Sequence, residues 1–196
     1  IKSEPLGHKL PEGARGWRIL YSTTRDGRPA SASAVVVVRG PAGAPRPVIA
    51  WAHGTTGIVA GCAPSVLGRP FDNVPGLDAL LAEGWGFVAT DYPGLGTPGG
   101  HAYLVGRDAA HAVLDAVRAA RGIAEAGLGD RVVVWGHSQG GTSALWSGMI
   151  AGEVVPSLRI MGIAALAPAS DLKGLVAASK GSMFGKIVSS YLIAAY

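Results

Sequence analysis

Short runs of apolar, β-branched residues alternate along the chain with segments of helical periodicity. The apolar runs predict strands at residues 17–24, 33–39, 48–53, 86–91, 131–136 and 159–167. The runs Val-Val-Val-Val at 35–38 and Val-Val-Val-Trp at 132–135 contain no polar residue, so neither face of these strands is expected to meet water. Strands that are apolar on both faces are typical of a parallel sheet covered by helices.

The segments between the later strands predict helices. A short helix is expected at residues 72–83, and an amphipathic one at 107–126, with Gly127 as its stop. A third helix should begin directly after Ser138 and run to about residue 151, before Pro156 prevents its extension. Two leading strands followed by βαβ units predict one α/β domain, whose mostly parallel sheet carries helices on both faces. The segment 172–196 looks helical, with breaks at Gly181 and Gly185.

Composition and charge exclude several classes of protein. A chain of 196 residues, 48% hydrophobic and 15% charged, can bury one core and is too apolar to be disordered, yet no apolar run is long enough for a membrane span. The net charge of +4 is dispersed, so no nucleic-acid partner is expected. Five histidines without an acidic or cysteine grouping predict no metal site.

The strongest chemical motif is Gly-His-Ser-Gln-Gly at residues 136–140, which follows an apolar strand and opens a helix. A serine nucleophile needs such a sharp strand-to-helix turn in a strained backbone conformation. Glycines two before and two after the serine let neighbouring backbone pack against the turn. We therefore interpret Ser138 as a candidate nucleophile, and a Gly-rich turn that binds phosphate is the alternative.

A second motif, His-Gly-Thr-Thr-Gly at residues 53–57, follows the strand that ends near residue 52. An acyl-transfer enzyme needs two backbone N–H donors aimed at the oxyanion. One comes from the residue after the serine, here Gln139, and the other from the loop after an adjacent strand. Thr55 is the first choice for this second donor and Thr56 is the second, while an ordinary βα turn is the alternative.

Four segments with a shared order and spacing carry a family resemblance: residues 52–57, Cys-Ala-Pro-Ser at 62–65, Thr-Asp-Tyr-Pro-Gly-Leu-Gly at 90–96, and residues 136–141. With them, nearly the whole chain resembles the α/β-hydrolase superfamily and, within it, the secretory lipase family of Candida lipase A and many actinobacterial lipases and esterases. The resemblance implies a secreted enzyme that hydrolyses carboxylic esters and lipids through a Ser–Asp–His triad and an acyl-enzyme, without a cofactor.

The resemblance also implies a division of the chain. Residues 1–171 would form the N-terminal part of the hydrolase core, and residues 172–196 would begin a cap. By the same resemblance Cys62 pairs with a cysteine of the cap, and a small buried thiol is the alternative. A lipid-binding surface on residues 173–196 is a weaker alternative to the cap.

The histidines depart from the family pattern. The triad histidine of such enzymes follows the serine, whereas His8, His53, His101, His111 and His137 all precede Ser138. We therefore expect the triad histidine, and the acid, outside this stretch, in the remainder of the same polypeptide or in a second chain that completes the fold. The sheet would then be incomplete at its C-terminal side, with an open apolar edge at residues 159–167.

Several polar residues have structural interpretations beside functional ones. Asp171 is a possible triad acid, although a helix N-cap is favoured. His53 is expected to fix the oxyanion loop by hydrogen bonding, His101 to be a loop residue that could line the pocket, and Asp91 to hold the turn that follows it. A noncatalytic binding module with this fold, and an acyltransferase that uses the same serine, remain alternatives to the ester hydrolase.

Overall fold

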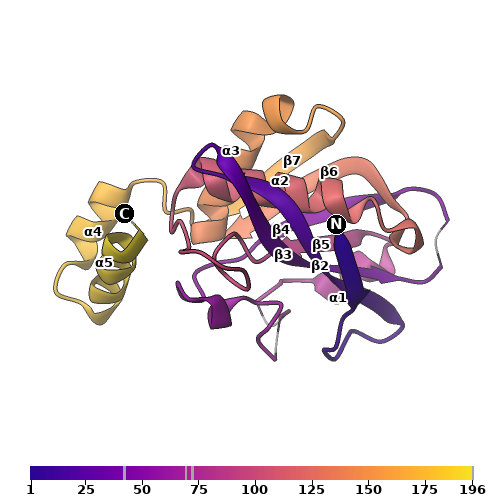
Figure 1. Ribbon diagram of the computed structural model, residues 1–196, viewed down its shortest axis with the longest axis horizontal. Helices are drawn as coiled ribbons and strands as arrows, with labels where there is room; N and C mark the ends of the chain where they lie inside the picture. Colours follow the sequence, from indigo (N-terminus) through magenta and orange to yellow (C-terminus); the bar gives the residue numbers. More distant parts are fainter. Residues whose placement is uncertain (42, 69, 72, 196) are drawn as a thin grey trace.

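The computed structural model describes residues 1–41, 43–68, 70–71 and 73–195, and in this part of the chain a seven-stranded sheet forms the centre (Figure 1). Four neighbouring strands run parallel, and the other three continue the sheet antiparallel to their neighbours. The structure thus confirms an α/β fold with a mixed, mostly parallel sheet. In sheet order the strands are β1 (Lys2–Pro5), β2 (Ala14–Arg25), β3 (Arg28–Arg39), β5 (Gly86–Thr90), β4 (Arg46–Ala52), β6 (Leu128–His137) and β7 (Arg159–Leu166).

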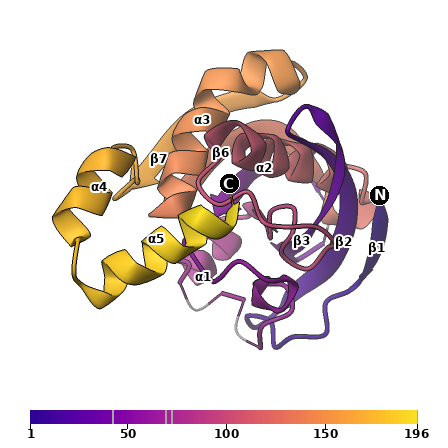
Figure 2. The ribbon, with the colours of Figure 1, turned by 60° about the vertical axis from the view of Figure 1, so that its left-hand side comes forward.

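Helices cover both faces of the sheet. The helices α2 (Gly106–Ala120) and α3 (Gln139–Val154) pack together on one face, and α1 (Leu77–Ala82) lies on the other (Figures 1 and 2). The strand β3 shows the consequence, because Val36 and Val38 belong to the core on the α2 side, while Val35 and Val37 belong to the core on the α1 side. The all-valine run therefore reports a strand buried on both faces, as expected.

Two helices are shorter than the sequence pattern predicts. The helix α1 begins only at Leu77 because Pro75 and the left-handed Gly76, with φ 65°, occupy its expected first turns; residue 72 lies outside the described residues. The helix α2 ends at Ala120, where Gly122, a poor helix former, follows closely. A short 3-10 turn, η2 (Ala124–Ala126), then leads into β6. A similar turn, η1 (Ala60–Cys62), lies in the loop after β4.

The helices α4 (Leu172–Ser179) and α5 (Met183–Ala195) lie at one end of the sheet (Figure 1). Gly181, with φ 83°, turns the chain between them, as predicted. The predicted break at Gly185 is wrong, because Gly185 lies buried within α5. A Cβ there would lie 2.1 Å from the carbonyl oxygen of Ser179, so this glycine allows α5 to approach the end of α4. No helix in the described residues is both long and apolar enough to cross a membrane.

The strand β7 forms an open edge. Within the described residues it pairs with β6 alone, and its side chains Met161 and Leu166 are 62% and 41% exposed. Met149 of α3 is also largely exposed. The apolar edge expected from the sequence is therefore present, and such an edge favours pairing with further strands.

Candidate active site

The turn between β6 and α3 has the strained geometry expected around residue 138. Ser138 adopts φ 56° and ψ −118°, a positive φ that is unusual for a residue other than glycine. Its N–H donates to the carbonyl of Leu166 at 2.9 Å, and its own carbonyl accepts from the N–H of Thr142 at 3.2 Å. Bonds to β7 and to the first turn of α3 therefore hold the strained turn in place.

Glycines permit this turn to lie directly on its neighbours. A Cβ on Gly136 would lie 2.1 Å from the carbonyl oxygen of Gly140, and a Cβ on Gly140 would lie 1.8 Å from that of Ala52. Both distances are far inside van der Waals contact, so no larger side chain fits without movement of the backbone. The expected packing role of the two glycines is confirmed.

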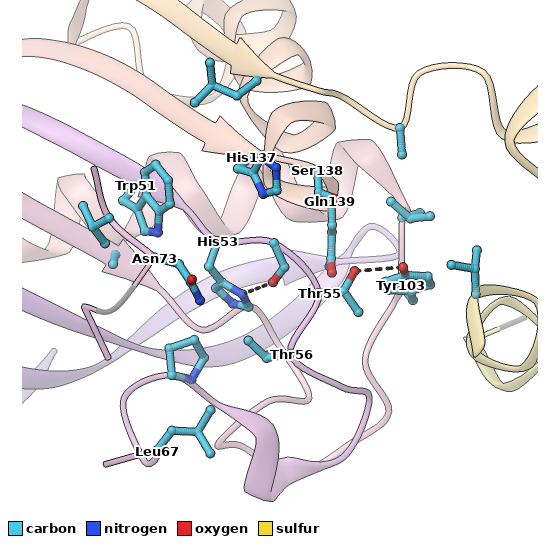
Figure 3. Close-up of a pocket in the computed structure, with 18 of the residues that line it drawn as sticks. Trp51, His53, Thr55, Thr56, Leu67, Asn73, Tyr103, His137, Ser138 and Gln139 are labelled. Carbon is cyan, nitrogen blue, oxygen red and sulfur yellow. Dashed lines mark hydrogen bonds between the residues drawn. The ribbon is translucent and has the colours of Figure 1, made fainter. Parts of the chain in front are cut away.

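The loop after β4 lies beside Ser138. A Cβ built on Gly54 would be 3.7 Å from the Cβ of Ser138. The next residues, Thr55 and Thr56, line the same cavity as Ser138 and Gln139 (Figure 3). Within the described residues, no backbone carbonyl accepts a hydrogen bond from the N–H of Thr55, Thr56 or Gln139. The structure thus brings the four residues singled out from the sequence together around one cavity. In the described part of the chain, the backbone N–H groups of Thr55, Thr56 and Gln139 are free of backbone acceptors, whereas that of Ser138 is bonded to Leu166.

The cavity above Ser138 has a volume of about 570 Å³, within the range of small-molecule sites. Its walls are mostly apolar. Trp51 of β4, Val74 of the segment before α1, and Phe184 and Ile187 of α5 are among its lining residues. An apolar cleft with a serine hydroxyl and free N–H donors at its floor suits a ligand that combines a hydrocarbon chain with a carbonyl group.

His53 holds the loop after β4, and both of its ring nitrogens lie near backbone carbonyls, Nδ1 near that of Gly54 and Nε2 near that of Asp91. Its Nδ1 donates to the carbonyl of Gly54 at 2.6 Å. The ring centroids of His53 and Tyr92 are 4.6 Å apart, and the Tyr92 hydroxyl donates to the His53 carbonyl at 3.1 Å. Burial lowers the pKa of His53 to about 4, so the ring is neutral near pH 7. The expectation that His53 fixes this loop is confirmed.

His101 has a larger part in the site than its loop position indicated. The ring is buried, and because the carbonyl of Pro93 can only accept, Nδ1 carries the proton and donates to it at 3.2 Å. The unprotonated Nε2 then accepts from Nε2 of Gln139 at 2.8 Å. Burial lowers the pKa of His101 to about 4, which keeps this neutral form near pH 7.

Tyr103 is a site residue that the sequence analysis missed. Its hydroxyl lies 2.8 Å from Oγ1 of Thr55, and its ring meets that of Tyr191 in α5 edge-on, with centroids 5.6 Å apart. No motif marks it. The signal was its place in the loop after β5, since the carboxyl ends of parallel strands meet at one edge of a sheet.

Asp91 is buried but does not hold the turn that follows it, so that expectation is wrong. Its carboxylate accepts from the hydroxyl of Ser33 at 2.5 Å and from the N–H of Ser65 at 2.8 Å. It therefore ties the end of β5 to β3 and to the segment 62–65. In the turn itself the N–H of Tyr92 donates to Oγ1 of Thr90.

Other candidates lie apart from the serine hydroxyl. Asp171 caps α4 by accepting from the N–H of Gly174 at 2.9 Å, as the N-cap interpretation predicts, and it is not among the residues that line the cavity. Cys62 is half-buried against Gly57, and its disulfide stays a prediction. In the part of the chain that the structure describes, no three His, Cys, Asp or Glu side chains gather to hold a metal ion.

The buried neutral histidines predict a loss of stability in acid. An unfolded histidine titrates near 6.5, against about 4 for folded His101. Above pH 6.5 both states are neutral, and between 6.5 and 4 only the unfolded state binds the proton, so the free energy of unfolding decreases as the pH falls. For His101 the loss reaches about 2 kcal/mol at pH 5.

Urea unfolding of the wild-type protein and of His101→Asn, at pH 7 and at pH 5, measures how much His101 contributes to the pH dependence of stability. Between the two pH values, the variant should lose about 2 kcal/mol less stability than the wild type. Burial raises the pKa of Asp91, which acts in the opposite direction, but Asp91 titrates in both proteins and cancels from the difference. An equal pH dependence in the two proteins would show that His101 is charged or exposed.

Known proteins share this chain's sequence pattern. A family model described as "Secretory lipase" matches residues 74–195. A Mycobacterium tuberculosis (strain CDC 1551 / Oshkosh) protein named "probable inactive lipase" is 29% identical over 179 residues, which cover 83% of this chain and 39% of that protein. The chain therefore spans well under half the length of this relative.

Solved structures share the architecture. Candida antarctica lipase A in its closed state matches all of this chain and 47% of its own, with a TM-score of 0.81 at 20% identity. The esterase LipA from Xanthomonas oryzae, described as degrading rice cell walls, matches with a TM-score of 0.73 at 26% identity, over 92% of this chain and 51% of its own. The fold is thus that of the α/β-hydrolase lipases. The family model matches more than half of the residues of this chain, so the chain belongs to the secretory lipase family.

Proposed function

We propose that this protein is a serine hydrolase that cleaves carboxylic esters, with Ser138 as the nucleophile. The observation that carries the proposal is the strained Ser138 turn, which stands beside free N–H donors at the floor of an apolar cavity. Membership of the secretory lipase family supports lipase or esterase chemistry. It also supports a role in lipid breakdown outside the cell.

The reaction would proceed through an acyl-enzyme. Oγ of Ser138 attacks the ester carbonyl carbon and its proton passes to a general base, while the carbonyl oxygen becomes an oxyanion. The N–H groups of Gln139 and of Thr55, or of Thr56 in its place, donate to that oxyanion. The C–O bond then breaks and the alcohol leaves with the proton. Water next attacks the acyl carbon, which releases the acid and restores the serine hydroxyl.

The general base of this reaction is proposed to come from outside residues 1–196. Among the histidines, His8, His53 and His101 have ring nitrogens engaged with groups other than Ser138. A histidine from the remainder of the polypeptide, or from a second chain, would complete the triad together with an acid. The open edge of β7 offers a place for the strands that would bring it. Residues 172–196 would then begin the cap, since α4 and α5 border the cavity.

Turnover of a p-nitrophenyl ester series, from acetate to palmitate, by the protein in its full natural length tests the proposal. We expect release of p-nitrophenol with saturation kinetics. A competing alcohol acceptor separates hydrolysis from acyl transfer, because a hydrolase forms mainly the free acid. If the main product at a low concentration of the acceptor is instead the ester of that alcohol, the protein is an acyltransferase.

A noncatalytic ester-binding module is the second candidate, and it is favoured by the name of the Mycobacterium tuberculosis relative, "probable inactive lipase". Such a module would keep the apolar cavity and lose turnover. Calorimetric titration with a nonhydrolysable ether analogue of the best ester distinguishes the two. Binding of the analogue without turnover of any ester would overturn the hydrolase proposal in favour of the module.

A further inference from the structure

We propose that His101 and Tyr103 are positioning residues for the oxyanion hole, so that one short loop, residues 101–104, holds both of its donor residues. The inference rests on the proposed function, because it concerns the groups that would stabilise the oxyanion. Neither residue touches the reacting atoms. Each would act through a hydrogen bond to the side chain of a donor, His101 through Gln139 and Tyr103 through Thr55.

The bond from Gln139 to His101 fixes the first residue of α3. The Gln139 side chain is 2% exposed, and its Nε2 donates to His101, whereas its Oε1 is buried without a partner among the described residues. A buried carbonyl oxygen without a partner costs about 1–3 kcal/mol, so Oε1 does not favour this orientation of the amide. The bond between Nε2 and His101 is the contact that holds the amide there. As the first residue of α3, Gln139 has a backbone N–H without an acceptor inside the helix. No backbone carbonyl of the described residues accepts from this N–H either, so it stays available to a ligand.

The bond between Tyr103 and Thr55 fixes the opposite side of the hole. Thr55 is exposed to the cavity and lies in a loop without regular structure, so its own sequence neighbours constrain it little. The 2.8 Å contact between the two hydroxyl groups ties this loop to the buried Tyr103. Figure 3 shows Thr55 between Gln139 and Tyr103, with this contact as a dashed line.

The loop that carries both positioning residues is itself tightly held. The N–H of Tyr103 donates to the carbonyl of His101 at 2.9 Å, and Leu104 has φ 60°, a strained value for leucine. Backbone strain of this kind persists only where surrounding contacts fix the conformation. One rigid element that reaches both donors fixes the spacing between them, which an oxyanion hole requires.

Tyr103 also connects the hole to the cavity wall. Its ring packs against Tyr191 and Val188 of α5, in a cluster that includes Leu104. Val188 and Ile187 line the cavity from that helix. A shift of α5 would therefore reach Thr55 through the side chain of Tyr103, which contacts both.

Kinetics of Tyr103→Phe and His101→Leu in the full-length protein test the inference. Tyr103→Phe removes only the hydroxyl that meets Thr55, and His101→Leu removes the acceptor for Gln139. Because misplaced donors weaken only the transition state, we expect kcat to fall about 10-fold or more in each variant, with KM changed less than about 3-fold. His101→Gln restores an acceptor and should recover most of kcat. Tyr21→Phe, which removes a buried hydroxyl bonded to Thr90 and the Ala112 carbonyl, serves as the matched control.

Hydrogen exchange measured by mass spectrometry gives a second readout that needs no turnover. Exchange at residues 53–57 should accelerate in Tyr103→Phe, and exchange at residues 137–142 in His101→Leu, with unchanged exchange in β4 and β6. If these accelerations occur while no protein turns over esters, the hydrolase proposal fails, and what stands is that His101 and Tyr103 fix the backbone around Gln139 and Thr55. If the wild type turns over esters and both variants keep its kcat, or if exchange at both segments is unchanged, the positioning role is overturned.

Discussion

Ser138→Ala is expected to lower the rate of ester hydrolysis by at least about 10⁴-fold, because it removes the atom that forms the acyl-enzyme. The free N–H donors and the apolar cavity remain in the variant, so substrate binding should persist and only the chemical step should be lost. The loss should therefore appear in kcat. The substitution should leave the backbone strain of the turn unchanged, because alanine has to adopt the same φ of 56° as serine.

The matched control for this change is Ser147→Ala in the same helix. Ser147 is fully buried, and its hydroxyl donates to the carbonyl of Ser143 at 2.8 Å, two turns beyond the candidate nucleophile. Steady-state kinetics on one p-nitrophenyl ester compares the two variants with the wild type. We expect Ser147→Ala to keep kcat within about 3-fold of the wild type, since it loses a single helix-internal hydrogen bond. Wild-type kcat in Ser138→Ala would exclude Ser138 as the nucleophile.

Gly140→Ala is expected to destabilise the fold by more than about 4 kcal/mol, the range reached only by severe clashes and cavities. A Cβ at this position would lie 1.8 Å from the carbonyl oxygen of Ala52, which is backbone and cannot rotate away. The strand β4 that carries Ala52 is held on both sides by β5 and β6, so it cannot shift either. The variant should therefore separate α3 from β4 and open the site.

Chemical denaturation of Gly140→Ala and of Gly152→Ala makes the comparison, because both glycines lie in α3. A Cβ on Gly152 meets nothing within 4 Å, and alanine favours the helix over glycine by up to about 1 kcal/mol. Gly152→Ala should therefore leave the free energy of unfolding unchanged or increase it. Equal stability of the two variants would show that the close approach between α3 and β4 is absent in solution.

The fold was largely predictable from the sequence because its signals are local. The unbroken runs at 35–38 and 132–135 predicted strands buried on both faces, and these valines do divide between the two cores. The Gly-His-Ser-Gln-Gly motif predicted a strained serine, and Ser138 has the positive φ that this needs. The strand β1 was missed because its four residues are all exposed and carry no apolar pattern.

The candidate site was predictable only where neighbours in sequence are neighbours in space. Ser138 and Gln139 lie in one motif, and Thr55 lies in another directly after a strand. The contacts of His101 with Gln139 and of Tyr103 with Thr55 join residues 38 and 48 positions apart, so no spacing rule could indicate them. The carboxylate of Asp91 likewise bonds to Ser33 and Ser65, which are brought to it by tertiary packing and not by its own turn.

The intact mass of the full-length protein, before and after treatment with an aryl phosphonate, tests most directly whether Ser138 is the nucleophile. This reagent forms a stable bond only with an activated serine, in a geometry that resembles the ester transition state. We expect one rapid adduct per chain, located by peptide mapping at Ser138 and absent from Ser138→Ala. An unmodified protein, or an adduct at another residue, would contradict it.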